Sequence, residues 1–275
     1  DFTRQIWELN GCNAASLGTI GVRSKTLNLP GGLTTPDPMT LYGDLYTLAE
    51  AGVKYAAVEA SSHGLDQYRL DGMHLDAAAF TNLTRDHLDY HLTESSYYYA
   101  KARLFGELLA PGATAVINVA SAYGKTLDDL CWGRGLKRLT VGYDRAASFA
   151  ITDLTLLPKG QKVIVQFDGS DYSMNVPLIG GFQIENALVA VALATATGID
   201  PREALASLEE LTGVMGRMQY MGSSASGGSV YVDFAHTPAG LETVLKAARA
   251  HKPSNLSVVV GCGGNRDVGK RPQMG

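Results

Sequence analysis

The sequence predicts an α/β protein in which a mostly parallel sheet is flanked by helices and joined by a small antiparallel sheet, with a second, shorter α/β unit after it. Short apolar segments alternate with helical ones up to residue 142, a pattern typical of a parallel sheet covered on both faces. Between residues 149 and 177, strand-like segments follow one another with only turns between them, which indicates antiparallel pairing. A strand–helix–strand pattern begins again at residue 230.

The first half of the chain supplies the parallel sheet and its covering helices. A helix over residues 1–10 ends at Gly11. The remaining segments are assigned from short apolar runs for strands and from three- and four-residue apolar spacing for helices. We expect strands at 14–22, 53–60, 76–82, 114–119 and 138–142, and helices at 39–51 and 95–109.

The second half begins with the antiparallel segments, which are joined by the turn-like sequences PKG and DGSD. We expect strands at 149–157, 161–167 and 172–178, then helices at 186–197 and 201–211. The second helix has proline at its start, where a missing N–H costs no hydrogen bond.

A Ser/Gly-rich segment at 223–229 has the composition of a flexible hinge. After it we expect a strand at 230–234, a helix at 238–250 and a strand at 256–261 that enters a glycine-rich turn. We therefore divide the chain into a central domain over 1–222 and the start of a Rossmann-like domain over 223–275, which is too short to close a sheet of its own.

Composition narrows the classes of function. The net charge of −4 gives no whole-chain reason to expect a nucleic-acid or membrane partner, and no apolar run is long enough to cross a bilayer. The three cysteines are far apart and form no CxxC pair, which favours free thiols in a reducing compartment. We expect a cytoplasmic protein.

The two ends of the sequence have features expected of a truncated chain. The chain starts at Asp1, not Met, with a helix that no strand precedes, and it stops within GKRPQMG, which reads as the opening of another helix. We expect the complete protein to extend beyond both ends.

Polar residues that follow neighbouring strands suggest a metal site. Glu59 ends one predicted strand and His87 closely follows the next. Ligands bind at the carboxyl ends of parallel strands, so this carboxylate and imidazole could share a divalent cation. The alternative is that polar residues simply gather where strands leave the core.

Two loops offer donors to an anionic substrate. Ser61, Gln67 and Arg69 supply hydroxyl, amide and guanidinium groups around His63. Thr34 and Thr35 lie between prolines, where a rigid turn is the alternative to hydroxyl contacts with a sugar or carboxylate. The other histidines are more typical of surface or core residues.

The last fifty residues contain two further motifs. Asp233 and His236 follow a predicted strand, and Pro238 opens a helix whose N-terminal N–H groups suit an anion. GCGG at 261–264 precedes Arg266, Lys270 and Arg271, and cations beside glycines suit phosphates or carboxylates. GCGG does not match GxGxxG, and GxxxxGK[ST] occurs nowhere in the chain.

Taken together, these stretches resemble the Mur ligases, the ATP-dependent ligases of bacterial cell-wall synthesis, over essentially the whole chain. The motifs that carry the resemblance are LTTPDP, EASSHGLDQYR, FTNLTRDHLDYH, AKARLF, GFQIENALVAVALA, GVMGRMQ, VDFAHTPAGLE and GCGGNRDVGKRPQMG. It is greatest to the members that add the third residue, meso-diaminopimelate or L-lysine, to UDP-N-acetylmuramoyl-L-alanyl-D-glutamate. The resemblance implies a cytoplasmic, monomeric enzyme with Mg²⁺ and ATP as its partners in catalysis.

The resemblance also implies roles for individual residues. Glu59 and His87 match magnesium ligands, and Lys101 matches a catalytic lysine that carries a carbamate and completes the metal site. Without the family, Lys101 would read as a solvated helix lysine. Positions that match the muramoyl-dipeptide and amino-acid contacts are Thr34, Thr35, Ser61, Gln67, Arg69 and Arg266. Positions that match ATP contacts are Asn186, Arg217, Asp233 and His236, and Lys270 matches a catalytic basic position.

The implied reaction activates a carboxylate that is otherwise a poor electrophile. The family transfers the ATP γ-phosphate to the substrate carboxylate, and the amino acid's amine then attacks the acyl phosphate. Mg²⁺ and cations stabilise the charge on the transferring group, and two domains close around the substrates.

The chain departs from the family pattern at several places. The uridine-binding domain, the P-loop and the segment that selects the amino acid would all lie outside it, so we expect this piece alone to be inactive. Asn265 replaces a usual Asp and Met215 a common Pro. Alternatives are another member of the superfamily, such as a folylpolyglutamate synthase, or a non-catalytic binding paralogue.

Overall fold

The computed structural model describes residues 1–84, 86–262 and 270–275. One sheet has the order β3-β2-β1-β4, with β4 parallel to β1 and the others antiparallel. Its strands are β1 (Ala14–Gly18), β2 (Gly21–Ser24), β3 (Asn28–Leu29) and β4 (Tyr55–Val58). The single strand predicted over 14–22 is therefore wrong: the chain reverses after Gly18, and Gly21 occupies a left-handed backbone conformation with φ +88°.

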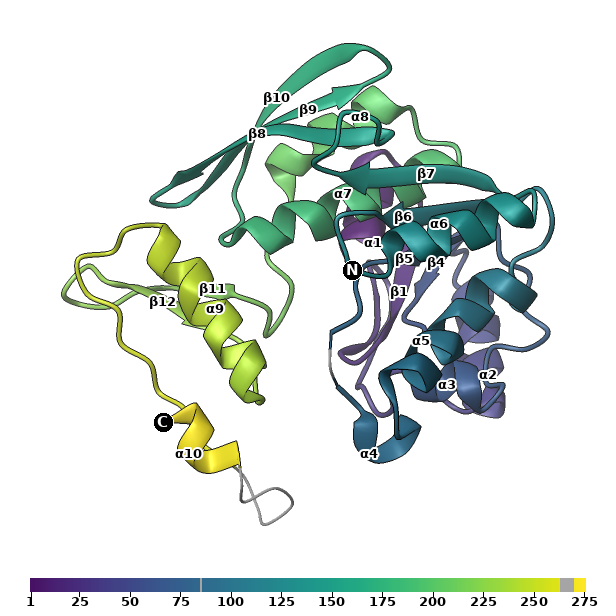
Figure 1. The fold of residues 1–275 in the computed structure, drawn as a ribbon, viewed down its shortest axis with the longest axis horizontal. Helices are drawn as coiled ribbons and strands as arrows, with labels where there is room; N and C mark the ends of the chain where they lie inside the picture. Colours follow the sequence, from purple (N-terminus) through teal and green to yellow (C-terminus); the bar gives the residue numbers. More distant parts are fainter. Residues whose placement is uncertain (85, 263–269) are drawn as a thin grey trace.

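The second sheet has the order β10-β9-β8-β7-β6-β5 (Figure 1). Its strands are β5 (Ala77–Phe80), β6 (Thr114–Asn118), β7 (Lys137–Gly142), β8 (Phe149–Leu157), β9 (Gly160–Phe167) and β10 (Ser170–Val176). The run from β5 to β8 is parallel and the run from β8 to β10 is antiparallel. The predicted mixture of parallel and antiparallel strands is confirmed, and the antiparallel part continues the parallel sheet through β8.

Helices pack on both faces of these sheets, as the alternation predicted. In β6, Val116 points to one hydrophobic core, while Ala115 and Ile117 point to the other, because successive side chains of a strand face opposite ways. The first core contains α1 (Phe2–Leu9) and α7 (Gly181–Ala196). The second contains α2 (Pro38–Glu50), α3 (Ser62–Asp66), α5 (Glu94–Arg103) with the π-helical turn Leu104–Leu108, and α6 (Gly124–Gly133).

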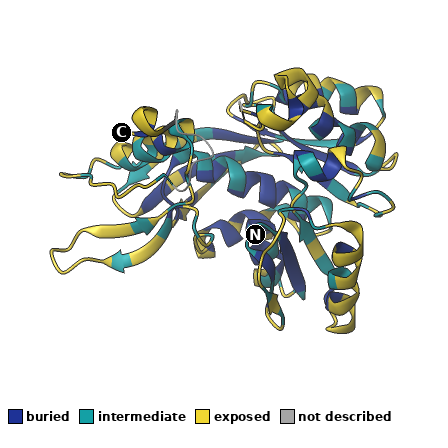
Figure 2. Ribbon diagram, turned by 90° about the horizontal axis from the view of Figure 1, so that it is seen from below, coloured by how far each residue is buried: buried dark blue, intermediate teal, exposed yellow. Residues whose placement is uncertain are grey.

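Local sequence sets where helices begin. Asp37 accepts hydrogen bonds from the N–H groups of Met39 and Thr40, with Pro38 in the first turn of α2. Asp200 caps α8 (Pro201–Ala206) in the same way, and a 3₁₀ turn follows at Ser207–Glu210. Helix α7 is apolar on most sides and lies buried between α1 and the second sheet, where each buried Leu or Val contributes about 1.5–3 kcal/mol. Figure 2 shows buried residues gathered at the centre of the molecule and exposed ones toward its rim.

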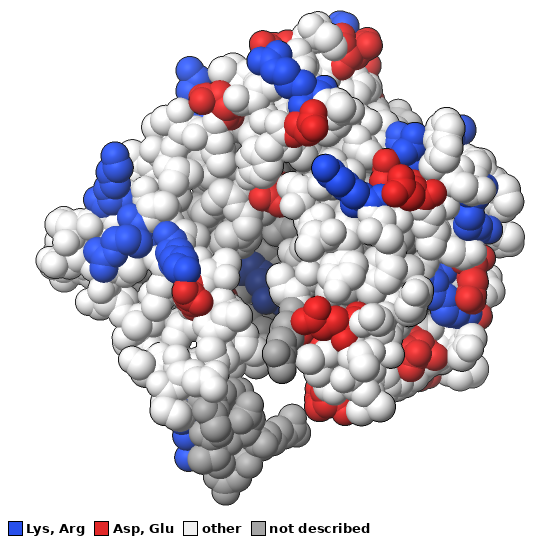
Figure 3. Space-filling view, viewed as in Figure 1, with Lys and Arg blue, Asp and Glu red and all other residues white. Residues whose placement is uncertain are grey.

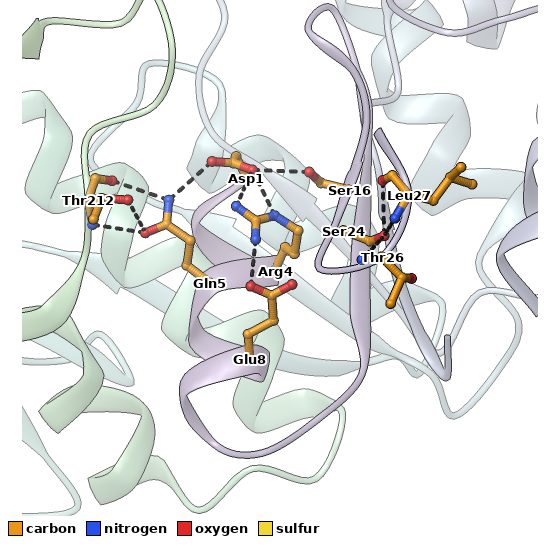
Figure 4. A network of polar contacts seen from close by, with 9 residues as sticks. All are labelled: Asp1, Arg4, Gln5, Glu8, Ser16, Ser24, Thr26, Leu27 and Thr212. Atoms are coloured by element: carbon orange, nitrogen blue, oxygen red, sulfur yellow. Dashed lines mark hydrogen bonds and ion pairs between the residues drawn. The ribbon is translucent and has the colours of Figure 1, made fainter. Parts of the chain in front are cut away.

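A polar network ties the first helix to distant parts of the chain (Figure 4). The Gln5 side chain donates to the Thr212 carbonyl at 3.2 Å, and its Oε1 accepts from the Thr212 N–H at 2.9 Å. The Ser16 hydroxyl on β1 donates to the Asp1 carboxylate at 3.1 Å. These bonds fix α1 against β1 and against the segment that leads out of the central region.

The two sheets share their helical layers but are not hydrogen-bonded to each other within the described residues. β4 pairs only with β1, and β5 pairs only with β6. A cavity of about 1530 Å³ lies between them and is lined by every residue of both strands. The unpaired edges of β4 and β5 thus face a shared cleft.

The last part of the chain forms a hairpin with one packed helix. β11 (Gln219–Ser223) and β12 (Ser229–Val232) pair antiparallel, followed by α9 (Pro238–Ala250) and, after the undescribed residues, α10 (Lys270–Met274). The segment predicted to be a hinge, 223–229, forms the turn of this hairpin. The predicted boundary at residue 222 falls inside β11, and the division into 1–222 and 223–275 stays a prediction.

The strand predicted over 256–261 is wrong. No strand is present between residues 255 and 262 of the described chain, and Val259 is 102% exposed. An apolar run needs a neighbouring strand to become part of a sheet, and β12 is paired only with β11. Across the described ranges, every helix is too short or too polar to pass through a bilayer.

Candidate active site

The turn between β1 and β2 holds the side chain of Glu59, which directly follows β4. The backbone N–H and the hydroxyl of Thr19 both donate to Oε2 of Glu59, at 2.9 and 3.0 Å. The Glu59 N–H donates to the Leu17 carbonyl at 2.8 Å, which continues the parallel pairing of β4 with β1. The carboxylate is therefore oriented at the carboxyl edge of the sheet while the residue stays exposed.

Thr35 lies beneath Glu59 and is fully buried. Its hydroxyl donates to the Glu59 carbonyl at 2.7 Å and accepts from the Ser61 N–H at 2.9 Å. Arg69 donates to the Thr35 carbonyl at 2.7 Å. Thr35 thus braces the proline-rich loop against the end of β4, and the substrate contact predicted for it stays a prediction.

The other predicted substrate residues gather around the start of α3. Thr34 Oγ1 lies 3.0 Å from Thr19 Oγ1. Ser61 caps α3 by accepting from the Gly64 N–H at 3.0 Å. Gln67 donates to the Tyr90 hydroxyl at 3.0 Å and accepts from Arg69. The structure therefore brings all five predicted residues of the central region into one connected network.

His87 is fixed by its backbone and by two aromatic neighbours. It sits at the start of α4 (Leu88–His91) with φ 54°, and its N–H donates to Asp86 Oδ1 at 2.8 Å. The imidazole packs edge-on against His63 and Tyr97, with ring centroids 4.9 and 5.8 Å away. A left-handed backbone at a non-glycine residue costs about 1–3 kcal/mol and is common at functional sites.

Two further histidines complete this cluster. His91 stacks on Tyr97 with centroids 5.2 Å apart, and its Nε2 lies 2.9 Å from the Ser62 hydroxyl. Burial lowers the pKa of His63 and of His91, and the neighbouring imidazoles lower both further. Both rings therefore favour the neutral form near pH 7.

Lys101 approaches the same cluster from α5. Burial lowers the pKa of its amine, while the charges of Glu59 and Asp86 oppose that effect. Its Nζ lies 5.4 Å from the Tyr97 ring centroid. Burial thus increases the share of the neutral amine, which is the form that reacts with CO₂.

The predicted ATP contacts lie on the second part of the chain and on α7. Arg217 stacks on Phe234 with its guanidinium carbon 5.4 Å from the ring centroid. The Asp233 carboxylate accepts from the N–H groups of Met218 and Ala235 at 2.8 and 2.7 Å, so it shapes the turn after β12. His236 Nδ1 lies 3.0 Å from the Phe234 carbonyl.

Asn186 lies one turn along α7 from Gln183, whose side chain donates to the Arg217 carbonyl at 3.3 Å. That bond links the helix to the segment carrying Arg217. The catalytic and substrate roles predicted for Lys270 and Arg266 stay predictions, because Arg266 and the Lys270 side chain lie outside the described residues.

The cleft between β4 and β5 brings most of the candidates together. It extends to the second part of the chain, and Figure 3 shows the molecule hollowed between the two parts. Candidate residues that line it are Thr34, Glu59, Ser61, His87, Lys101, Arg217 and His236, whereas Thr35, Gln67, Arg69, Asn186 and Asp233 do not. The volume is ample for a nucleotide and a second substrate.

Three residues at this site were not predicted from the sequence: Thr19, Tyr97 and Phe234. Thr19 follows the end of β1, as Glu59 follows β4, but the strand predicted over 14–22 included it, so the strand-end rule could not locate it. Tyr97 lies four residues before Lys101, on the same helical face. Phe234 gave no signal apart from its place between Asp233 and His236.

The side chains in the cleft suit Mg²⁺ better than a metal that takes all of its ligands from the protein. Among the described residues, no three His, Cys, Asp or Glu side chains gather closely enough to hold an ion. Mg²⁺ typically uses one or two carboxylates and takes its remaining ligands from waters and substrate phosphates. Glu59, His87 and a Lys101 carbamate would suit that pattern.

Comparison with known families agrees with this geometry. Residues 1–194 match the Mur ligase middle domain, and residues 216–275 match the Mur ligase glutamate ligase domain. The chain belongs to the Mur ligase family.

Curated relatives specify the similarity further. The chain is 47% identical over 274 residues to a UDP-N-acetylmuramoyl-L-alanyl-D-glutamate–2,6-diaminopimelate ligase from Chelativorans sp. (strain BNC1). It is 49% identical over 275 residues to a ligase of the same name from Mesorhizobium japonicum. Each alignment covers 100% of this chain and 56% of the relative, so the chain spans about half the length of these relatives.

Solved structures show the same relation. A structure of a UDP-N-acetylmuramoyl-L-alanyl-D-glutamate–2,6-diaminopimelate ligase superposes with a TM-score of 0.79 at 35% identity, over 99% of this chain and 56% of that one. A folylpolyglutamate synthase from Mycobacterium tuberculosis has a TM-score of 0.70 at 17% identity, over 91% of this chain and 63% of that one. The second likeness reflects the shared fold.

Proposed function

We propose that the complete protein containing this chain is an ATP-dependent ligase of peptidoglycan synthesis, which joins 2,6-diaminopimelate to UDP-N-acetylmuramoyl-L-alanyl-D-glutamate. The observation that carries the proposal is the convergence of Glu59, His87 and Lys101 on one cleft, beside the Thr34 and Ser61 loops. The relatives at 47% and 49% identity bear that activity in their names.

The metal site is assigned to Glu59, His87 and Lys101. The neutral Lys101 amine attacks the carbon of CO₂, a C–N bond forms as one C=O π bond becomes an oxygen lone pair, and one proton leaves to solvent, so that a neutral amine becomes an anionic carbamate. The surroundings support this step, because burial lowers the pKa of the amine. Mg²⁺, when bound, neutralises charge on the transferring phosphoryl group.

The remaining residues bind and orient the reactants. Thr34 and Ser61 line the cleft and would contact the muramoyl-dipeptide through their hydroxyl groups, while Arg69 supports their loop through the Thr35 carbonyl. Arg217 and His236 line the cleft from its other side and would contact ATP, with Asn186 and Asp233 supporting that side. Transfer of the γ-phosphate makes the substrate carboxylate electrophilic, and attack by the amino acid's amine then forms the amide and releases phosphate.

The test uses the complete reading frame that contains this chain. Its purified product is incubated with ATP, Mg²⁺, the muramoyl dipeptide and one amino acid, and phosphate release is measured. We expect release that requires meso-diaminopimelate. Release with L-lysine instead would correct the amino acid, release with a folate substrate would move the protein to another branch, and no release with any of them would overturn the proposal.

A further inference from the structure

The turn that follows β1 encloses one oxygen of Glu59. Both Thr19 donors reach Oε2, and within the described residues no hydrogen bond reaches Oε1. One oxygen is thereby committed to the protein and the other is left for a ligand. Such an arrangement favours a metal bound through a single carboxylate oxygen.

The fit around Oε2 is tight. A Cβ placed on Gly18 would lie 2.4 Å from Oε2 and 3.0 Å from the Glu59 Cβ, so only glycine leaves room for this side-chain position. The neighbouring Glu59 N–H is bonded to Leu17. Three consecutive residues of the β1 end, Leu17 to Thr19, therefore fix both the backbone and the carboxylate of Glu59.

The hydroxyl protons of this cluster have only one consistent arrangement. An ionised carboxylate only accepts hydrogen bonds, so the Thr19 hydroxyl donates its single proton to Glu59. The 3.0 Å contact between Thr19 and Thr34 must then be donated by Thr34. The result is a chain of two bonds from the substrate loop to the carboxylate.

We propose that Thr19 is a positioning residue, which holds Glu59 for single-oxygen metal coordination and links that coordination to Thr34. The inference rests on the proposed function, since it takes Glu59 as a metal ligand. Groups that orient metal ligands typically change metal affinity about 10–100-fold when removed. Thr34 acts on the metal only through Thr19.

The experiment titrates Mn²⁺ alone into the complete protein that contains this chain, with bound and free metal distinguished by electron paramagnetic resonance. Mn²⁺ stands in for Mg²⁺ because both prefer octahedral oxygen ligands. The variants are Glu59→Gln, Thr19→Val, Thr19→Ser and Thr34→Val, together with the Thr19→Val/Thr34→Val pair. Val keeps the shape of Thr without its hydroxyl, and Ser keeps the hydroxyl. Urea unfolding midpoints check that each variant is folded.

We expect Glu59→Gln to abolish binding, Thr19→Val to weaken it about tenfold, and Thr19→Ser to restore it. Thr34→Val should weaken binding less, and adding it to Thr19→Val should change nothing further. Unchanged affinity in a folded Thr19→Val chain would overturn the positioning role while leaving the metal site intact. No binding by the unaltered complete protein would overturn both this role and the metal assignment. Independent, additive effects of the two valines would overturn the link to Thr34.

Discussion

The carboxyl edge of the central sheets and the last sixty residues differ in how completely their polar groups are hydrogen-bonded and their apolar side chains are buried. At the sheet edge, Thr35 is joined to Glu59 and to Arg69 by hydrogen bonds of 2.7 Å each, and the Thr19 hydroxyl donates to Glu59 at 3.0 Å. In the last part of the chain, Val258, Val259 and Val260 are exposed and β11 and β12 pair only with each other.

The difference teaches that the two halves of the candidate site are preorganised to different degrees. Residues of the central region are oriented by partners within the same sheets and helices. Arg217 and His236 depend on a hairpin and one helix, which reach the central region through contacts such as Gly180 N–H to His251 Nε2 at 3.1 Å. Changes at the sheet edge should therefore have larger and more local effects than changes beyond residue 215.

The largest effect is expected at Lys101. In the complete protein, Lys101→Met removes the proposed carbamate and should lower kcat about 10²–10³-fold, with a smaller change in KM. Steady-state phosphate release measures both constants. Lys125→Met on the exposed side of α6 is the matched control and should leave both unchanged. Equal activities in the two variants would show that Lys101 has no part in the chemistry.

A smaller effect, on stability, is expected at Thr35. Thr35→Val leaves the Ser61 N–H without its acceptor and the Glu59 carbonyl without its donor, which should lower the free energy of unfolding by about 1–3 kcal/mol. Urea unfolding of the 275-residue chain measures it. Thr35→Ser keeps both bonds and should lose less. If valine and serine destabilise equally, packing and not hydrogen bonding explains the loss.

A pH effect should appear in the same region. The pKa of His91 is lowered in the folded chain by burial and by His63, so below about pH 6.5 the unfolded chain binds more protons. Stability should therefore fall as the pH drops through that value, and His91→Asn should reduce the fall. Urea midpoints at about pH 7.5 and about pH 5.5 test this, and an unchanged pH dependence in the variant would contradict it.

The smallest effect is expected in the last part of the chain. Val259→Lys replaces a fully exposed valine and should change the stability of the 275-residue chain by no more than about 0.5 kcal/mol. Val163→Ala in buried β9 is the contrasting variant and should cost about 1 kcal/mol or more. A large loss for Val259→Lys would show that the valines are packed after all and would remove the contrast between the two regions.

Much of the fold could be predicted from the sequence, because the spacing of apolar residues and the position of polar turns depend only on nearby residues. The strands at 114–119 and 149–157 were predicted within one residue of β6 and β8. The strand predicted at 256–261 is absent from the structure. An apolar run predicts a buried strand, but a strand forms only where a neighbouring strand is available to pair with it. The reversal at Thr19 was missed because β1 and β2 are short and the mainly apolar run over residues 14–22 extends across the turn between them.

The site was predictable only in part. Glu59 and His87 follow neighbouring strand ends, and the structure places both on one cleft. The sequence could not show that the Thr35 hydroxyl is buried, because its two bonds go to backbone groups about 25 residues away in the chain. Nor could it reveal the ring contacts of Tyr97, which depend on how α4 and α5 pack.

The cleft between β4 and β5 has a consequence for motion. Among the described residues, each of these strands has a partner strand on one side only, so the N–H groups that point into the cleft depend on solvent for their hydrogen bonds. Their amide protons should exchange with water quickly, whereas those of β6, paired on both sides, should exchange only when the sheet opens. Amide exchange at the centre of the molecule should thus occur on two timescales, and Glu59 directly follows a strand, β4, whose amides exchange on the faster one.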